Sequence, residues 1–345
     1  MMIRWSPYFA SLAIAILVFC GCGRKGELYT FSRMQIGTLI NITVIADTPE
    51  RGVRASNAAF SEIARVESLM SPKRAGSDIV SINNSAWKAP VHISGETYAL
   101  MRKSIAISEQ TDGAFDITFA SVGTLWQLAN PSFVPPDSAV VKKRLFLVNF
   151  RNIKLDDAAH TVMFKHKGIQ IGLGGIAKGH AVGLAAAALR REGVRASIID
   201  AGGDLMVRGT KFGNTWRVGL RHPRNDEILL VFTAHDGDAI VTSGDYERYK
   251  IVKGVRYHHI LDPHTGFPAK GLISATVVCS DPIDAVDADA YATALFVMGG
   301  VRAREFTKKH PELRVILIDE GMKISASKAL KKRITPLEKV AIEWF

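Results

Sequence analysis

A carboxylate and a hydroxyl are spaced one helical turn apart near the end of the chain. Asp289 and Thr293 are four residues apart in an alanine-rich stretch of helical pattern, so both side chains lie on one face of the predicted helix. Oxygen donors with no sulfur or imidazole beside them suit Mg²⁺, which keeps substrate phosphate oxygens among its ligands. The pair is a candidate magnesium site. A capped or solvated aspartate is the default alternative, which the apolar surroundings weaken.

Two glycine-rich turns precede this helix. The segment Gly172–Gly179 follows an apolar run and opens a predicted helix, so its backbone N–H groups and the Lys178 ammonium are placed to face a bound phosphate. It does not match the Walker pattern, because no Ser or Thr follows Lys178. A second turn, Asp200–Asp204, follows the next strand, and the two turns could border one crevice. The alternatives are structural: a tight connection for the first turn, and a bulge or hairpin corner for the second.

Hydroxyls, imidazoles, carboxylates and aromatic rings are concentrated between Thr242 and Gly266. His258 and His259 are neighbours on a predicted strand, so their side chains point to opposite faces and cannot both enter one site. We find no further ligand set that would make this a zinc site. A single histidine here is as often a structural hydrogen-bonding residue as a catalyst.

Helical and strand patterns come in blocks along the chain. Alternating apolar residues at 40–44 predict a half-buried strand, and Thr48-Pro49 predicts the start of a helix. Further helices are predicted at 97–110, 176–191 and 285–298. Short β-type runs predominate in the second half, at 196–200, 216–220, 228–234, 257–261, 273–279 and 313–318. Because strands and helices do not alternate regularly, this order predicts an α+β fold with a largely antiparallel sheet.

The first residues determine the expected compartment. The apolar run at 8–19 has the length of a signal-peptide core and not that of a membrane span. A glycine and then Cys22 follow it, as in bacterial lipoprotein processing, so Cys22 is expected to be the acylated first residue of the mature chain. We expect a lipoprotein signal peptide at 1–21, a tether at 22–30 and one domain at 31–345. A cleaved signal with a soluble product, or an uncleaved anchor, are alternatives that still export the chain.

Cysteine and charge counts restrict the remaining classes of protein. Cys279 is the only cysteine after Cys22, so the exported body has no internal disulfide and must be stable through its core. The formal net charge of +11 suits a phosphate-bearing ligand, an acidic partner or an anionic membrane surface. Nucleic acid is not expected as a partner, because the chain is predicted to be exported and has no basic stripe with interleaved aromatic residues.

In this order, these segments resemble the FAD:protein FMN transferase family, the ApbE-type flavin transferases. The resemblance covers nearly all of the mature chain and rests on eight short motifs: Ile36-Gly37-Thr38, Ser77 to Asn83, Gly113 to Thr118, Gly174 to Gly179, Ala201 to Asp204, Thr242 to Tyr249, His259 to Gly266 and Ala288 to Phe296. It implies a T-fold-like α+β domain in which a largely antiparallel sheet packs with helices. It also implies an FAD site and a divalent ion at the pyrophosphate. Three positions depart from the family pattern: Gly172 replaces an aspartate, Ile36 replaces a methionine, and the usual aromatic residue of a further segment falls near Lys73.

The resemblance also implies roles for single residues. Flavin-nucleotide contacts are expected from Ile36, Ala114, Phe115, Asp116, Lys178, His259 and Ile273. Magnesium ligands are expected from the Gly175 carbonyl and from the side chains of Asp289 and Thr293. Two catalytic roles follow: Lys178 spreads the charge that develops on phosphate, and His259, as a group that titrates near neutral pH, orients or deprotonates the incoming hydroxyl.

These roles predict magnesium-dependent transfer of FMN from FAD to a Thr or Ser hydroxyl of an exported acceptor protein, with release of AMP. The alternatives are an FAD pyrophosphatase, in which water replaces the hydroxyl, and a flavin-binding lipoprotein without turnover. From the resemblance, the expected acceptor is a protein such as a subunit of a sodium-pumping NADH:quinone oxidoreductase or of an RNF-type complex. The expected location is the bacterial cell envelope, with the lipid-anchored protein facing the periplasm, on the inner membrane in preference to the outer.

Overall fold

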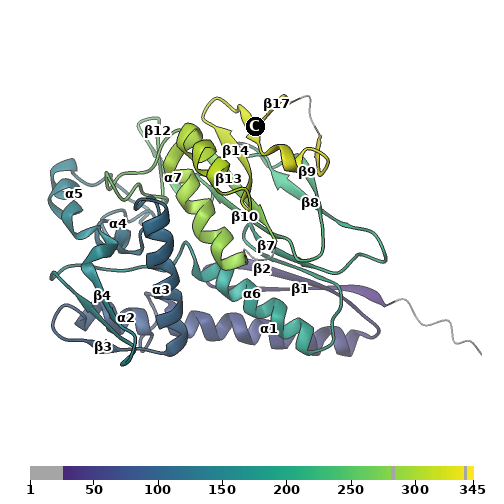
Figure 1. Ribbon diagram of the computed structural model, residues 1–345, viewed down its shortest axis with the longest axis horizontal. Helices are drawn as coiled ribbons and strands as arrows, with labels where there is room; N and C mark the ends of the chain where they lie inside the picture. The colour runs from purple at the N-terminus through teal and green to yellow at the C-terminus, as the bar shows by residue number, and fades with distance from the viewer. Residues whose placement is uncertain (1–25, 281–283, 338–339) are drawn as a thin grey trace, which may run out of the picture.

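A nine-stranded sheet forms the centre of the computed structural model, which describes residues 26–280, 284–337 and 340–345 (Figure 1). All neighbouring strands are antiparallel except the last two, which are parallel. The prediction of an α+β fold with a largely antiparallel sheet is therefore confirmed. In sheet order the strands are β1 (Glu27–Gln35), β2 (Thr38–Ala46), β6 (Ser197–Ala201), β7 (Asp204–Arg208), β10 (Ala239–Gly244), β13 (Leu272–Cys279), β14 (Arg314–Asp319), β15 (Ile324–Ala326) and β17 (Ile342–Trp344).

The predicted alternating strand is β2, whose Ile40, Ile42 and Val44 are fully buried. It pairs with the edge strand β1 over its whole length, with Glu27 opposite Ala46. Residues 27–30, which we predicted as part of the tether, therefore belong to the sheet. The lipidation site Cys22 and the signal peptide lie outside the described residues.

Three long helices cover one face of the sheet: α1 (Pro49–Met70), α6 (Ala177–Arg191) and α7 (Ala285–Lys309) (Figure 1). The predicted start of α1 is confirmed, because the Thr48 hydroxyl accepts a hydrogen bond from the Arg51 N–H and proline occupies the first turn. Helix α7 does not end near Met298 as predicted. It continues to Lys309 across a kink at Gly299, where φ is 74°.

A second, three-stranded sheet covers the opposite face with a separate apolar core. It consists of β8 (Trp216–Arg221), β9 (Ile228–Ala234) and β16 (Ile334–Pro336). The fully buried Phe232 of β9 packs in a cluster that includes Ile240 and Val278 of the central sheet. The central sheet is therefore covered on both faces, which makes it a rigid support for loops at its ends.

The remaining elements form the region at the left of Figure 1. Its helices are α2 (Asp78–Ser85), α3 (Gly95–Gln110), α4 (Ala120–Gly123) and α5 (Ser138–Arg144), with short 3₁₀ turns at Ile117–Phe119, Leu145–Leu147 and Phe150–Asn152. Its strands are β3 (Val91–His92), β4 (Ile153–Asp156) and β5 (Thr161–Phe164), and a hairpin of β11 (Tyr249–Val252) and β12 (Val255–His258) lies beside it. The strand predicted at 257–261 is therefore misplaced, since β12 overlaps it only at Tyr257 and His258. A last 3₁₀ turn, Lys328–Leu330, lies near the C-terminus.

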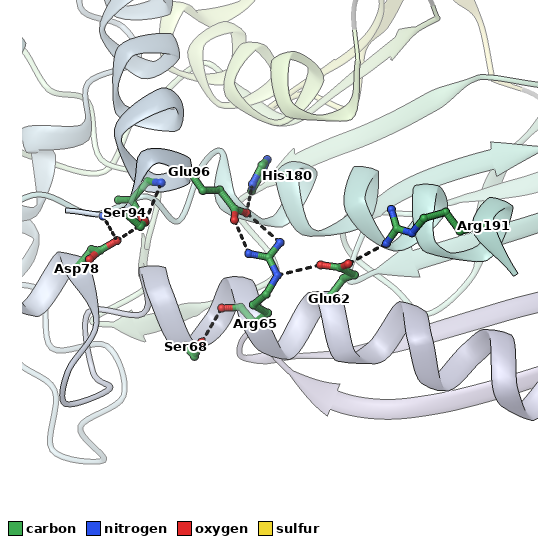
Figure 2. A network of polar contacts seen from close by, with 9 residues as sticks. Glu62, Arg65, Ser68, Asp78, Ser94, Glu96, His180 and Arg191 are labelled. Atoms are coloured by element: carbon green, nitrogen blue, oxygen red, sulfur yellow. Dashed lines mark hydrogen bonds and ion pairs between the residues drawn. The ribbon is translucent and has the colours of Figure 1, made fainter. Parts of the chain in front are cut away.

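A polar network ties α1, α3 and α6 together (Figure 2). Glu96 in the first turn of α3 forms an ion pair with Arg65 of α1 and lies 2.7 Å from Nε2 of His180 in α6. Glu62 of α1 accepts a hydrogen bond from Arg191 at the other end of α6, at 2.8 Å. These contacts hold α6 near both ends. None of the described helices is long and apolar enough to cross a membrane.

Candidate functional site

A glycine at the crossing of α6 and α7 brings two charged residues together. A Cβ atom at Gly179 would lie 2.1 Å from the carbonyl oxygen of Ala285, so only glycine permits this approach. The Gly179 N–H donates to Asp289 Oδ2 at 2.9 Å. The ammonium of the preceding residue, Lys178, lies 3.9 Å from Oδ1 of the same carboxylate. Lys178 and Asp289, 111 positions apart in the sequence, thus meet as predicted site residues.

Asp204 completes this cluster of charged side chains. Its Oδ2 lies 2.6 Å from the Lys178 Nζ, and its side chain is 1% exposed, against 26% for Lys178. Oδ1 of Asp204 has no hydrogen-bond partner among the described residues. Because a buried acceptor without a donor is costly, this oxygen marks a place where a ligand or an ion would find a partner.

The charges in this cluster shift the pKa of Lys178 and that of Asp204. Burial lowers the pKa of Lys178, but the negative charges of Asp204 and Asp289 outweigh it, so the pKa is raised above its ordinary value. Burial and then the neighbouring charge of Asp289 raise the pKa of Asp204 to about 8, despite the opposing effect of Lys178. A divalent ion beside these carboxyl groups would lower the pKa of Asp204 and favour its ionised form.

Neutral oxygen donors surround the carboxylate of Asp289. Thr293 follows it by one turn of α7, and its hydroxyl lies 3.2 Å from the hydroxyl of Ser243 in β10. A Cβ atom at Gly175 would lie 3.1 Å from the Thr293 Oγ1, so the backbone before α6 passes directly beside this hydroxyl. The predicted metal-binding residues Gly175, Asp289 and Thr293 are therefore brought together.

This donor set fits magnesium. Within the described part of the chain, no group of three or more His, Cys, Asp or Glu side chains could hold a metal ion. An ion at this place would therefore depend on neutral protein oxygens and on substrate oxygens as well as on Asp289. Mg²⁺ is commonly bound in this way, by one or two carboxylates together with substrate phosphates.

His259 directly follows β12 and contacts the backbone of Arg248, the residue before β11. Its N–H and its Nδ1 both lie within hydrogen-bond distance of the Arg248 carbonyl, at 3.1 and 3.3 Å. A carbonyl only accepts, so Nδ1 carries the proton and Nε2 keeps its lone pair. Burial lowers the pKa of His259 to about 3, and the charges of Arg248 and Lys178 contribute to this. The expectation that His259 titrates near neutral pH is therefore wrong: in this structure the imidazole is neutral.

His258 points away from His259, as the strand pattern predicts. It is buried, its Nε2 donates to the Ala269 carbonyl at 2.9 Å, and its ring packs edge-on against Phe296. Only His259 remains available to a substrate. Lys178 lies near enough to this imidazole for its positive charge to lower the pKa of His259.

Comparison with known proteins identifies the family. The ApbE family model matches residues 36–317. The chain belongs to the ApbE family. A protein of Treponema pallidum named FAD:protein FMN transferase is 30% identical over 95% of this chain and 96% of its own length, and one of Vibrio cholerae with the same name is 30% identical over 95% and 98%. The crystal structure of the ApbE protein of Thermotoga maritima superposes with a TM-score of 0.82 and 34% identity, covering 89% of this chain and 99% of that one.

The ApbE motif at Ala114, Phe115 and Asp116 lies against the same site but is buried. Phe115 packs on the backbone of Gly175. A Cβ atom added at Gly175 would lie 3.2 Å from the Phe115 ring. The Asp116 carboxylate accepts hydrogen bonds from the N–H and hydroxyl of Thr118 and from the N–H of Phe150, at 2.8, 2.6 and 2.7 Å. Because these hydrogen bonds hold the Asp116 side chain inside the protein, the backbone of this segment is the part that could contact a nucleotide.

Ile36 lies at the tip of the β1–β2 hairpin in a strained conformation. Ile36 and Gly37 both have positive φ, 45° and 76°, and a β-branched residue is rare in this region. Thr38 at the end of this turn packs against Gly202, where a Cβ would lie 2.2 Å from the threonine hydroxyl. The turn is therefore adjacent to the loop that leads into Asp204, and strain of this kind is concentrated at functional sites.

Two predicted contacts differ from expectation. The Ile273 side chain is 1% exposed and packs in the core beneath β8 and β9, so only its backbone could meet a nucleotide. At the start of α6, the Ala177 N–H already donates to the Leu173 carbonyl and the Gly179 N–H to Asp289. The helix N-terminus thus offers few free N–H groups, and Lys178 is the main positive group for a phosphate.

Gly172, where this chain departs from the ApbE pattern, does not require glycine for steric reasons. An added Cβ would lie 3.5 Å from the side chains of Phe119 and Ala120, which is an ordinary contact. Its N–H donates to the Ile117 carbonyl at 2.9 Å. A Cβ atom is therefore accommodated at this position without displacing the backbone.

Two residues of the site were not assigned a role from the sequence alone. Asp204 stood only as an acid in a glycine-rich turn, and Ser243 only as one of several hydroxyls. The sequence signal for Asp204 was its position directly after two glycines that follow a strand. Side chains at such turns can border a crevice. Nothing local in the sequence pairs Ser243 with Thr293, because the contact joins β10 to α7.

Proposed function

We propose that this chain transfers FMN from FAD to a Thr or Ser hydroxyl of an acceptor protein, with magnesium, and releases AMP. The observation that carries the proposal is the buried cluster of Lys178, Asp204 and Asp289 with a neutral His259 nearby. The names of the relatives, FAD:protein FMN transferase, support the same reaction.

Asp289, Thr293 and the Gly175 carbonyl would hold the magnesium ion. When bound, Mg²⁺ neutralises part of the charge of a pyrophosphate. Lys178 adds a full positive charge to the same site. Asp204 Oδ2, which lies 2.6 Å from the Lys178 Nζ, holds this ammonium in place. Phosphoryl transfer depends mainly on such positioning and charge stabilisation, which a site of few, rigidly held groups can supply.

His259 is placed to receive the proton of the acceptor hydroxyl. The hydroxyl oxygen forms a bond to the FMN phosphorus while the bond from that phosphorus to the bridging oxygen breaks. AMP leaves with that oxygen and its electron pair, and Nε2 takes the proton. The neutral imidazole has a free lone pair for this proton, and the negative charge of a bound pyrophosphate would raise its pKa from the low value of the ligand-free site.

The decisive experiment measures products. Purified protein is incubated with FAD, Mg²⁺ and an exported acceptor domain that contains a Thr or Ser target, and products are identified by mass spectrometry. Flavinylated acceptor with stoichiometric AMP supports the proposal. Free FMN and AMP would indicate an FAD pyrophosphatase, and bound, unchanged FAD would indicate a flavin-binding protein without turnover.

The metal assignment has a matched control on the same helix. Asp289→Asn keeps an oxygen for the Gly179 N–H but removes the charge, and we expect transfer to fall by about 100-fold or more, the range seen when a single charge-stabilising group is removed. Asp287→Asn changes a carboxylate two residues away that pairs with Lys103, and it should leave the rate nearly unchanged. Equal rates for the Asp289 variant and the parent at limiting Mg²⁺ would refute the assignment.

We place the protein in the bacterial cell envelope, anchored through an acylated Cys22 and facing the periplasm, on the inner membrane in preference to the outer. The acceptor is then an exported protein, such as a subunit of a sodium-pumping NADH:quinone oxidoreductase or of an RNF-type complex. Metabolic labelling with a fatty-acid analogue should mark the parent and not Cys22→Ser. A labelled Cys22→Ser variant would remove the lipidation site from the proposal.

A further inference from the structure

A basic groove lies at the end of α6 that is remote from Lys178. It has a volume of about 970 Å³ and runs between the ends of β2 and α6 and the start of β6. Its floor contains small residues, among them Gly183, Ala186 and Ala196. A second hollow of about 560 Å³ shares Arg195 and Ala196 with it and extends toward the turn that follows β7. The groove is not part of the candidate active site.

Three arginines in this groove have no acidic partner. Of the carboxylates that line it, two already form ion pairs, Asp47 with Arg51 and Glu192 with Arg54, and the third, that of Asp236, accepts the Gly209 N–H. Among the described residues, no ion pair or hydrogen bond involves the side chains of Arg190, Arg195 and Arg208. Within the part of the chain that the structure describes, the groove therefore presents three arginines without a paired carboxylate, against the single unpaired carboxylate of Asp236, beside a floor of small residues.

An exposed aromatic residue lies at the rim. Phe212 is 48% exposed at the tip of a two-residue turn, in which Lys211 and Asn214 exchange backbone hydrogen bonds. Phe212 and Gly213 both have positive φ, 52° and 88°. Asparagine is the usual residue at the first of these positions, so a phenylalanine there is strained as well as exposed.

The chain enters the domain at this same face. Gly26, the first described residue, lines the second hollow and packs on the carbonyl of Ala46. The apolar run at 8–19 precedes it closely in the sequence. In Figure 1 the start of β1 and the end of α6 both lie at the right of the molecule. With Cys22 acylated, as proposed above, this face lies next to the membrane.

We propose that this face docks on the anionic surface of a lipid bilayer. Arg190, Arg195 and Arg208 bind phosphate groups of anionic phospholipids, and Phe212 enters the headgroup region. Basic side chains are attracted to anionic leaflets within a Debye length, and aromatic rings favour the membrane interface. Docking here turns the Lys178 end of α6 away from the bilayer and toward an acceptor. The inference concerns orientation and does not require the proposed chemistry.

The test uses the full chain reconstituted in nanodiscs. Amide hydrogen exchange of segments 190–197 and 208–214 is compared between discs of phosphatidylglycerol and discs of phosphatidylcholine. We expect exchange to slow at least about threefold in the anionic discs, and this protection to disappear in about 1 M salt, where the Debye length is about 3 Å. FMN transfer measured in detergent reports folding independently.

Two variants of equal charge change make the comparison specific. The triple variant Arg190→Gln, Arg195→Gln, Arg208→Gln should lose the protection. The control variant Lys142→Gln, Lys143→Gln, Arg144→Gln removes three exposed charges from α5 and should retain it. Equal exchange in both kinds of disc, or equal loss in both variants, would overturn the proposal. Equal protection by inorganic phosphate or glycerophosphoglycerol without a bilayer would also overturn it and indicate a site for free anions.

Discussion

Replacing Gly179 by alanine tests whether the crossing of α6 and α7 sets the geometry of the site. The new Cβ would lie 2.1 Å from the Ala285 carbonyl oxygen and 2.7 Å from its carbon, and both are backbone atoms that cannot rotate aside. To reach an ordinary contact the helices must separate by roughly 1 Å. Lys178 and Asp289 then move apart, and the hydrogen bond between the Gly179 N–H and Asp289 is stretched.

The expected magnitude follows from two opposing terms. Overpacking against backbone belongs at the upper end of the range for such changes, about 3 kcal/mol. Alanine gains about 1 kcal/mol of helix propensity over glycine, so the free energy of unfolding should fall by about 2 kcal/mol. A misplacement of about 1 Å in a catalytic constellation costs on the order of 100-fold in rate, so transfer should suffer far more than stability.

Gly183→Ala on the same helix is the matched control. An added Cβ at Gly183 meets nothing within 4 Å, so only the propensity gain remains and stability should rise by up to about 1 kcal/mol. Thermal unfolding and the rate of acceptor flavinylation, followed by in-gel flavin fluorescence, are measured for both variants. If Gly179→Ala keeps the parental transfer rate, the helix crossing does not position the reacting groups.

Three further outcomes are expected. In an NMR titration of the ligand-free protein, His259 should remain neutral from pH 5 to 9, because burial lowers its pKa to about 3. In the same titration the pKa of His264 should lie above its ordinary value, because a neighbouring aspartate accepts its hydrogen bond. Since the pKa of His264 is raised on folding, its stabilising contribution is complete below the ordinary pKa of about 6.5 and is lost as the pH rises through the folded value; a flat His264 signal would contradict this. Asp116→Ala should lower the free energy of unfolding by about 3 kcal/mol in a denaturant titration, since three buried donors lose their acceptor, and a loss below about 1 kcal/mol would refute that role. Phe212→Asn should raise it by about 1 kcal/mol, with unchanged transfer in detergent, and a lower stability would contradict the strain.

Local signals in the sequence predicted the elements that carry the site. The hydroxyl and proline at Thr48-Pro49 placed the start of α1, and the glycine at 193 placed the end of α6 within two residues. The spacing of Asp289 and Thr293 predicted one helical face, and in the structure Thr293 lies beside Gly175 and Asp289 beside Gly179. These predictions depend on periodicity and capping, which act over a few residues.

Long-range features could not be predicted in this way. The strand β1 has mostly exposed residues because it is the sheet edge, so it lacks the apolar alternation that identified β2. The pairing of Lys178 with Asp204 joins a helix to a strand, and nothing in either segment specifies the other. The low pKa of His259 results from burial and from Arg248 and Lys178 together, so a neutral-range histidine was the wrong expectation.

Helix α6 links the two ends of the molecule. Its first turn holds Lys178 at the candidate active site, and its last turn holds Arg190 at the basic groove, about 20 Å apart for a helix of 15 residues. With Cys22 acylated, the four residue steps from Cys22 to Gly26 span at most roughly 14 Å. The active site would then face outward at a limited height above the bilayer. Under the proposal that the chain is lipid-anchored, an acceptor residue would have to be presented within this layer.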